Sequence, residues 1–184
     1  QMLAHGMIIA LLFCLVGLIE ARTGTTAIPE LSGLLNPQRG LPFTLGLMLV
    51  ALMAAAGVPG LAGFVAELLV FEGSWVAFPI PTLVCLLASG LTAVYAVRLF
   101  NRVGFGRLDN ARADWISTRW SERAPALVLT GLVVFTGLWP TSLTGFSESA
   151  TAPLALRSSD AVTVVALTPG SLTASLPAAA NPAE

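Results

Sequence analysis

The stretch AAAGVPGLAGFVAELLVFEG, residues 54–73, places a carboxylate inside an apolar run and close to a cluster of helix-breaking residues. The carboxylate is Glu67, which has apolar or small neighbours on both sides. Proline removes a backbone donor and clashes with the preceding helical turn, and glycine readily adopts irregular backbone conformations. The stretch therefore predicts a helix that is interrupted before Glu67. The residues predicted to form the helix break are Gly57, Pro59, Gly60 and Gly63.

The composition of the whole chain is typical of a membrane protein. Of its 184 residues, 55% are hydrophobic and only 10% are charged, whereas soluble domains usually carry about 25% charged residues. Nine basic residues, all arginine, oppose ten acidic ones, which gives a formal net charge of −1. This near-neutral balance gives no support to nucleic-acid binding.

Four apolar runs are long enough to cross a bilayer, which takes roughly 20 apolar residues in a helix. The second run would measure about 44 Å as one continuous helix, and this length also favours an interruption. We therefore predict an all-α transmembrane fold over residues 1–143, with a discontinuous second helix. A soluble helical bundle is the competing interpretation, which four such runs disfavour. The predicted spans cover residues 1–19, 43–71, 81–100 and 124–140.

The sequence supports one prediction about the beginning of the chain and another about its C-terminal segment. Gln1 lies directly against the first apolar run. We therefore expect the chain to be the C-terminal portion of a longer membrane protein, although a short helix starting at the interface would look similar. Residues 144–184 are rich in Ser, Thr, Ala and Pro. We predict that this segment is a largely irregular tail on the non-cytoplasmic side.

The placement of arginine predicts the orientation of the spans. The link between the third and fourth spans is rich in arginine, whereas the link over residues 72–80 has none. Cytoplasmic loops carry an excess of basic residues, so the arginine-rich link is expected in the cytoplasm. Alternation then places the loop that holds Arg22 and Arg39 on the same side. The arginines of the cytoplasmic link are Arg102, Arg107, Arg112, Arg119 and Arg123.

Glu67 is the principal candidate for function. A carboxylate at the centre of a span costs about 2.5–3.5 kcal/mol, and such acids mark ion paths and proton relays. Non-helical backbone at membrane depth persists only against protein or a water-filled cavity. We therefore predict that Glu67 lies beside a cavity and relays protons. A structural ion pair and an interfacial anchor are the alternatives. Glu72, at the end of the apolar run, is predicted to be a solvated anchor.

His5, the single histidine, lies in the first span. A neutral imidazole donates at one ring nitrogen and accepts at the other, so it can pass a proton along a chain. A hydrogen-bonded packing histidine is equally compatible with the sequence. The polar and small residues of the third span are typical of close helix packing, with polar relay contacts as the alternative. These residues are Ser89, Gly90, Thr92 and Tyr95.

The spacing of Cys14 and Cys85 predicts no redox or metal chemistry on this chain. Both lie inside apolar runs, apart from each other and from His5. This spacing fits neither a disulfide pair nor a set of metal ligands. We expect both cysteines to serve in packing.

Two motifs in order, QMLAHGMIIALLF at residues 1–13 and GVPGLAGFVAELLVFEGSW at residues 57–75, resemble the antiporter-like membrane subunits of respiratory complex I and its photosynthetic relatives. The resemblance covers about residues 1–143 and implies the last four transmembrane helices of a larger bundle. In that family the broken helix carries glutamate in the chain 4 (M-type) subunit and commonly lysine in its sister subunits, so Glu67 points to chain 4. Residues 22–42 and 121–132 look most similar to cyanobacterial forms, with the CO2-uptake version as a candidate subtype.

The resemblance also implies a function. Glu67 would be the terminal acidic residue of a central hydrophilic axis, and His5 a relay residue in the preceding helix. Together they would translocate protons in an NAD(P)H- or ferredoxin-dependent plastoquinone oxidoreductase. The family's upstream lysines and ion-paired glutamate are absent from these residues, so a complete proton path cannot be carried by them alone. A subunit of a multi-subunit cation/proton antiporter, and a structural membrane subunit without its own ion path, are the alternatives.

The same resemblance implies where this chain works and with which molecules. The quinone, the iron–sulfur clusters and NAD(P)H or ferredoxin would be served by partner subunits, with no cofactor and no metal on this chain. The expected partners are other membrane subunits of the complex, especially neighbouring antiporter-like subunits, together with the lipid bilayer. The expected location is a cyanobacterial thylakoid membrane or a bacterial inner membrane.

Overall fold

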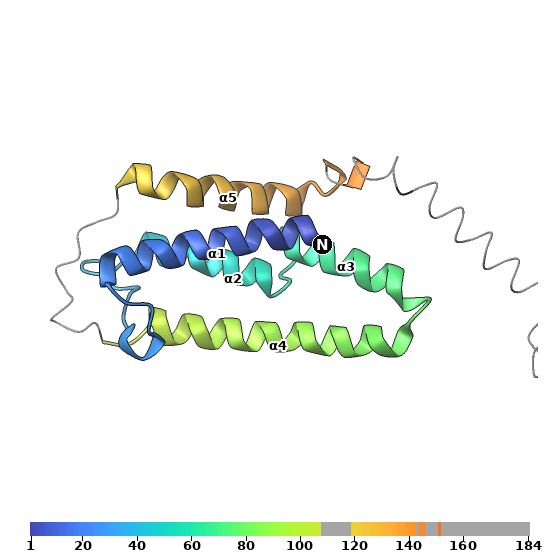
Figure 1. The fold of residues 1–184 in the computed structure, drawn as a ribbon, viewed down its shortest axis with the longest axis horizontal. Helices are drawn as coiled ribbons and strands as arrows, with labels where there is room; N and C mark the ends of the chain where they lie inside the picture. The colour runs from blue at the N-terminus through green and yellow to red at the C-terminus, as the bar shows by residue number, and fades with distance from the viewer. Residues whose placement is uncertain (108–118, 143, 146–150, 152–184) are drawn as a thin grey trace, which may run out of the picture. The chain divides into compact units, whose positions relative to one another are not determined.

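A computed structural model describes residues 1–107, 119–142, 144–145 and 151 of the chain. Within these residues the fold is all-helical. The second predicted span is divided into two 14-residue helices, separated by residues 56–61. The prediction of an all-α fold with a discontinuous second helix is therefore confirmed. The helices are α1 (Met2–Thr23), α2 (Pro42–Ala55), α3 (Ala62–Trp75), α4 (Pro79–Gly104) and α5 (Trp120–Leu138), with a short 3-10 helix at Ile28–Glu30 (Figure 1).

The helices run side by side within the unit Gln1–Pro140 (Figure 1). In the described part of the chain, α1, α4 and α5 are each long and apolar enough to cross a membrane. The shorter apolar helix α2 is continued beyond the interruption by α3. Helices α1 and α2 lie between α5 and α4. Of the second unit, Thr141–Glu184, the structure describes residues 141, 142, 144, 145 and 151. Most of the predicted irregular tail thus lies outside the described residues.

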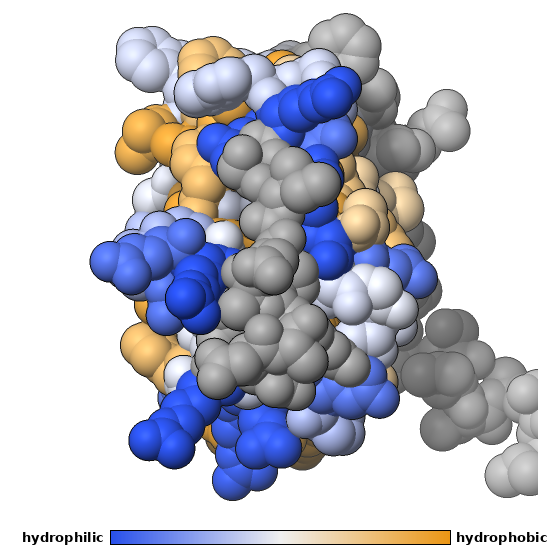
Figure 2. All heavy atoms as spheres, turned by 90° about the vertical axis from the view of Figure 1, so that its left-hand side faces the viewer, coloured by the Kyte–Doolittle hydropathy of each residue, from blue (hydrophilic) through white to orange (hydrophobic). Residues whose placement is uncertain are grey.

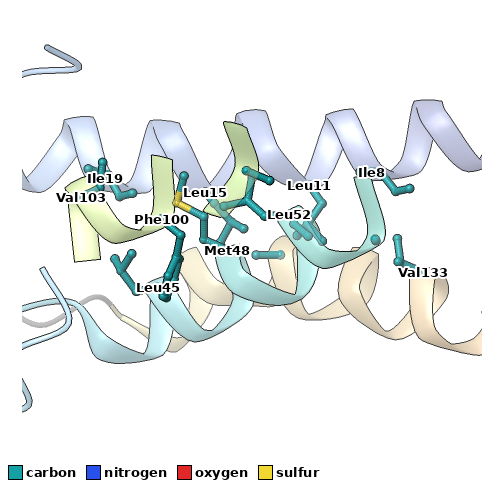
Figure 3. Packing of buried hydrophobic residues seen from close by; sticks show 14 of the residues in the cluster. Ile8, Leu11, Leu15, Ile19, Leu45, Met48, Leu52, Phe100, Val103 and Val133 are labelled. Carbon is teal, nitrogen blue, oxygen red and sulfur yellow. The ribbon is translucent and has the colours of Figure 1, made fainter. Parts of the chain in front are cut away.

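A stripe of apolar side chains along α1 forms the centre of the core. Its buried members recur every three or four residues, which places them on one face of the helix. This face packs against α2 and α5 (Figure 3). The stripe consists of Ala4, Ile8, Leu11, Leu15 and Ile19. The buried residues that complete the core include Leu45, Met48, Leu52, Phe100, Val103 and Val133.

The helices extend beyond the apolar runs that predicted them. Helix α1 continues past residue 19 to Thr23, because Gly24 adopts φ 71° and donates its amide to the Glu20 carbonyl at 2.8 Å. The left-handed glycine, rather than the first charged residue, ends the helix. Helix α5 begins at Trp120, where the Glu122 carboxylate accepts the Arg119 amide at 3.1 Å. Capping of this kind fixes a helix end independently of hydropathy.

The loop between α1 and α2 closes the end of α4. The backbone amides of residues 33–35 donate to the carbonyls of residues 103–105 at 3.0–3.2 Å. The Ser32 hydroxyl donates to the Arg107 carbonyl at 2.8 Å. The last carbonyls of a helix have no partner within it, so this loop supplies the missing donors.

The described parts of both arginine-bearing links lie at one end of the bundle, whereas Arg112 lies outside the described residues. Arg22, at the end of α1, forms an ion pair with Glu122 at the start of α5. The Arg123 guanidinium lies 4.8 Å from the ring centre of Phe43 and 5.6 Å from that of Trp120. Figure 2 shows hydrophilic side chains gathered over this end. The predicted topology places both links on the cytoplasmic side, which requires them to lie at the same end of the bundle. Which side of the membrane this end faces stays a prediction.

Candidate functional site

The helix break begins with a glycine-dependent turn at the end of α2. Gly57 has φ 70°, a left-handed conformation that other residues adopt only with strain. The Val58 amide donates to the Met53 carbonyl at 3.0 Å, and the Gly57 amide to the Ala54 carbonyl at 3.3 Å. This pair of bonds is a Schellman motif, which satisfies carbonyls that the helix leaves open. Pro59 follows directly and cannot continue the helix.

The remaining glycines have two different roles. Gly60 lies in the break with φ 92°. Gly63, in contrast, lies in the first turn of α3, outside the irregular segment. A Cβ atom on Gly63 would collide with the Ala54 carbonyl, so this glycine permits the close approach of α2 and α3. Gly137 in α5 does the same against the backbone of residues 60–61. The break is therefore packed against protein, as irregular backbone at membrane depth must be.

Glu67 lies one to two turns beyond the break and is half-buried between α3 and α4. The Ser89 hydroxyl donates to its Oε2 atom at 2.7 Å. A Cβ atom on Gly57 would lie 2.7 Å from the same oxygen, so the carboxylate rests against the bare backbone of the break. Within the described residues, no arginine or histidine lies within 4.0 Å of this carboxylate. The structural ion pair considered from the sequence is not formed there.

A first cavity of about 220 Å³ joins Glu67 to His5. Gln1, directly before α1, and His5 of α1 line one side of it, and Thr92 and Tyr95 line it from α4. Its apolar wall includes the end of α2. A water molecule needs about 10–15 Å³ of such space and several polar partners, so this cavity has room for a short water chain. The structure thus brings together the two residues predicted to relay protons.

A second cavity of about 310 Å³, more open to the outside than the first, lies against α3, α4 and Gln1. Ser89 and Cys85 line it from α4, and Val70 and Phe71 from α3. Glu67 lines both cavities. Gln1 and Thr92 also line both, so the two spaces adjoin each other at the Glu67 carboxylate.

His5 is exposed on α1. Its backbone amide donates to the Gln1 carbonyl at 2.9 Å as part of the helix. No hydrogen bond joins its side chain to any described residue, so the packing alternative lacks its expected partner here. Glu72 is exposed at the end of α3, as a solvated anchor would be.

Sequence reasoning gave too little weight to the polar residues of α4. Ser89, Thr92 and Tyr95 all line the cavities around Glu67, whereas the sequence favoured a packing role for them. Their spacing of three residues was an available signal, because positions three apart are neighbours on a helix surface. The sequence could not show that this surface faces α3.

Comparison with known proteins agrees with this architecture. Residues 1–92 match the family model described as NADH:quinone oxidoreductase/Mrp antiporter, transmembrane. NAD(P)H-quinone oxidoreductase chain 4 1 of Synechococcus elongatus is 35% identical over 97% of this chain and 34% of its own length. The F(420)H(2) dehydrogenase subunit M of Methanosarcina mazei is 33% identical over 76% of this chain and 28% of its own length. NADH-quinone oxidoreductase subunit M of Rhodobacter capsulatus is 35% identical over 78% of this chain and 28% of its own length.

These matches fix the family and confirm the resemblance seen in the two motifs. The chain spans about a third or less of the length of these relatives. It matches the membrane-embedded, antiporter-like subunits of quinone oxidoreductases, and its apolar helices agree with a multi-pass integral membrane protein. The chain belongs to the NADH:quinone oxidoreductase/Mrp antiporter family of membrane proteins.

Proposed function

We propose that this chain belongs to a proton-translocating chain 4 (M-type) subunit of a quinone oxidoreductase complex, in which Glu67 and His5 relay the proton. The observation that carries the proposal is the position of Glu67, a half-buried carboxylate that lines two cavities and has no ion-pair partner among the described residues. A permanently paired acid would be held in one charge state, whereas an unpaired one next to water can change its charge.

The proposed step uses ordinary acid–base chemistry. A proton enters the first cavity, where the His5 imidazole accepts it at one ring nitrogen and releases one from the other. The Glu67 carboxylate takes up the released proton and becomes neutral. It then loses this proton to the second cavity and becomes charged again. The quinone and the electron carriers would lie on partner subunits, among which the neighbouring antiporter-like subunits would contact this chain.

The finer form of the proposal is a photosynthetic complex in a thylakoid membrane, with NAD(P)H or ferredoxin as donor and plastoquinone as acceptor. The match with the Synechococcus chain 4 supports it, since that match covers 97% of this chain. The Rhodobacter and Methanosarcina relatives are nearly as similar, so donor and acceptor need a direct assay. A role in CO2 uptake is the most specific version. It predicts that a Glu67→Gln strain grows poorly when CO2 is scarce and normally when CO2 is abundant.

The central experiment compares Glu67→Gln with Glu72→Gln in the complete complex, reconstituted into vesicles. Both changes remove one carboxylate from α3, but Glu72 is exposed and lines neither cavity. We expect the Glu67 variant to assemble and to lose most of its proton pumping per electron transferred. The Glu72 variant should pump like the unaltered complex. Normal pumping by the Glu67 variant would overturn the proposal.

Two alternatives give different results in the same vesicles. The matched family includes Mrp antiporters, so a cation/proton antiporter subunit is the second candidate. In that case proton movement would follow a sodium gradient and would need no electron donor. For a structural subunit without an ion path, Glu67→Gln would lower the stability of the complex and leave its pumping unchanged.

A further inference from the structure

Ser89 departs from the hydrogen-bonding pattern of most other helical hydroxyls in the described part of the chain. Thr82 also donates to the Ser74 hydroxyl, and the buried Thr44 hydroxyl has no partner among the described residues. A serine or threonine inside a helix ordinarily donates to the carbonyl four residues earlier. Ser89 donates to Oε2 of Glu67 instead. The corresponding carbonyl, that of Cys85, is therefore left without this donor. The hydroxyls that follow the ordinary pattern, at 2.7–3.4 Å, belong to Thr23, Ser74, Thr82, Thr92, Thr130 and Thr136.

The same carboxylate oxygen also lies close to Gly57. The Cβ position of Gly57 lies 2.7 Å from Oε2 but 3.9 Å from Oε1 of Glu67. Oε2 thus lies next to both the Ser89 hydroxyl and the glycine backbone. Among the described residues, Oε1 accepts no hydrogen bond. The two oxygens of one carboxylate therefore have different surroundings: one accepts a hydrogen bond from Ser89, and the other accepts none among the described residues.

We propose that Ser89 is a positioning residue for Glu67, which pins Oε2 against Gly57 and leaves Oε1 to take up and release the proton. The inference rests on the proposed function, to which it adds Ser89 as a positioning residue and Oε1 as the atom of Glu67 that carries the proton. The Ser89 hydroxyl has two acceptors within its reach: the charged carboxylate and its own Cys85 carbonyl. A hydrogen bond to a charged acceptor is stronger than one to a neutral carbonyl. Protonation of Glu67 removes that advantage and lets the hydroxyl turn to Cys85, which frees the neutral acid to move toward the second cavity.

Several groups around Glu67 bear on its protonation. His5 faces it from α1, and Tyr95 and Cys85 line the same cavities from α4. Glu72 lies farther along its own helix and is exposed. None of these groups is hydrogen-bonded to the carboxylate in the described structure, whereas Ser89 is. Substitution of Ser89 by alanine therefore removes the one side-chain hydrogen bond to Glu67 in the described structure while keeping every ionisable residue.

The test uses the complete complex in vesicles with the variants Ser89→Ala, Ser89→Thr and Ser74→Ala. Ser89→Ala removes the donor, and Ser89→Thr keeps it. Ser74→Ala makes the same chemical change in α3, at a hydroxyl that donates to the Val70 carbonyl and accepts from the Thr82 hydroxyl of α4, away from Glu67. Proton pumping per electron is measured together with the infrared carboxyl band that is absent in Glu67→Gln. That band reports hydrogen bonding of the protonated acid.

We expect Ser89→Ala to lower the pumping rate about tenfold, the factor that corresponds to a hydrogen bond with a charged group, and to shift the Glu67 carboxyl band. Ser89→Thr should restore both readouts, and Ser74→Ala should change neither. If Ser89→Ala fails to assemble, Ser89→Cys, which retains a weak donor, should give an intermediate shift of the band. An unchanged band and unchanged pumping in Ser89→Ala, with pumping lost in Glu67→Gln, would overturn the role of Ser89 alone. Full pumping in Glu67→Gln would overturn the proposed function itself.

Discussion

The carboxylate of Glu67 occupies the space that a side chain on Gly57 would fill, since a Cβ atom there would lie 2.7 Å from Oε2. The break and the acid are therefore parts of one site. Gly57 supplies both the left-handed turn that ends α2 and the gap that receives the carboxylate. A short stretch of sequence thus determines both the interruption of the helix and the space that the Glu67 carboxylate occupies.

Gly57→Ala should displace the Glu67 carboxylate and reduce proton pumping. The added methyl group crowds Oε2, and the left-handed backbone costs about 1–2 kcal/mol with any side chain. Gly60→Ala separates these effects, because Gly60 also has a positive φ but a Cβ atom there meets nothing within 4 Å. We expect both variants to lower the melting temperature of the complex, and Gly57→Ala to lose more pumping. Equal losses in both variants would mean that the gap beside Gly57 has no part in the site.

His5→Gln should slow proton pumping even though glutamine preserves polarity and hydrogen bonding. An amide cannot gain and lose a proton near neutral pH, whereas an imidazole can. We expect a decrease of about 10²-fold, the lower end of the range for a lost proton-transfer group. Pumping is measured in vesicles against the electron-transfer rate of the same preparation. Unchanged coupling in His5→Gln would assign His5 to packing.

Cys85 offers a natural probe of the second cavity. Cys85 is exposed and lines the second cavity together with Glu67. Cys14, in α1, is less exposed and lines neither cavity around Glu67. Thiol reagents attack the ionised thiol, so a charged, water-soluble reagent reports water at the site. We expect Cys85 to react from the non-cytoplasmic side and to react faster than Cys14, as measured by mass spectrometry of the labelled complex. A Cys85 thiol that reacts only with lipid-soluble reagents would indicate a dry cavity.

Arg22→Ala should destabilise the bundle without changing the proton path. Arg22 joins α1 to α5 through its ion pair with Glu122, at the end opposite to the start of α4 (Figure 1). Glu122 is partly exposed to solvent and would keep its hydrogen bond from the Arg119 amide, so the lost ion pair is expected to cost only a small part of the stability. We expect the melting temperature to fall by a few degrees, with normal pumping in the complexes that assemble. Arg39→Ala, at an exposed arginine of the neighbouring loop, is the control and should leave the melting temperature unchanged.

The sequence predicted the helical fold well because apolar length and helix breakers act locally. Gly57 and Pro59 mark the break in the sequence itself, and the structure places it there. Gly63 shows the limit of this reasoning. Glycine serves a turn and a close helix contact equally well, so only the packing of Ala54 against Gly63 distinguishes the two roles. Hydropathy marks the apolar run of the predicted span over residues 1–19, whereas helix α1 itself continues to Thr23 and ends at Gly24.

The sequence predicted which residues belong to the candidate site, but it did not predict the contacts between them. Glu67 can be recognised from the sequence alone, because a carboxylate inside an apolar membrane span is energetically costly and therefore rare. The contact with Ser89 depends on α4 lying beside α3, which no local pattern specifies. The cavity shared with His5 depends in the same way on the approach of α1. Sequence reasoning therefore identified Glu67 and named Ser89 as a polar residue of α4, but it could not place the Ser89 hydroxyl against Glu67.

The central claim is that Glu67 is reached by water and changes its protonation during turnover. The most direct measurement is infrared difference spectroscopy of the complete complex during electron transfer, in H2O and in D2O. We predict a carboxyl band that changes with turnover, shifts in D2O and is absent in Glu67→Gln. A spectrum in which turnover changes no carboxyl band assigned to Glu67, or in which that band is unmoved by D2O, would contradict the account.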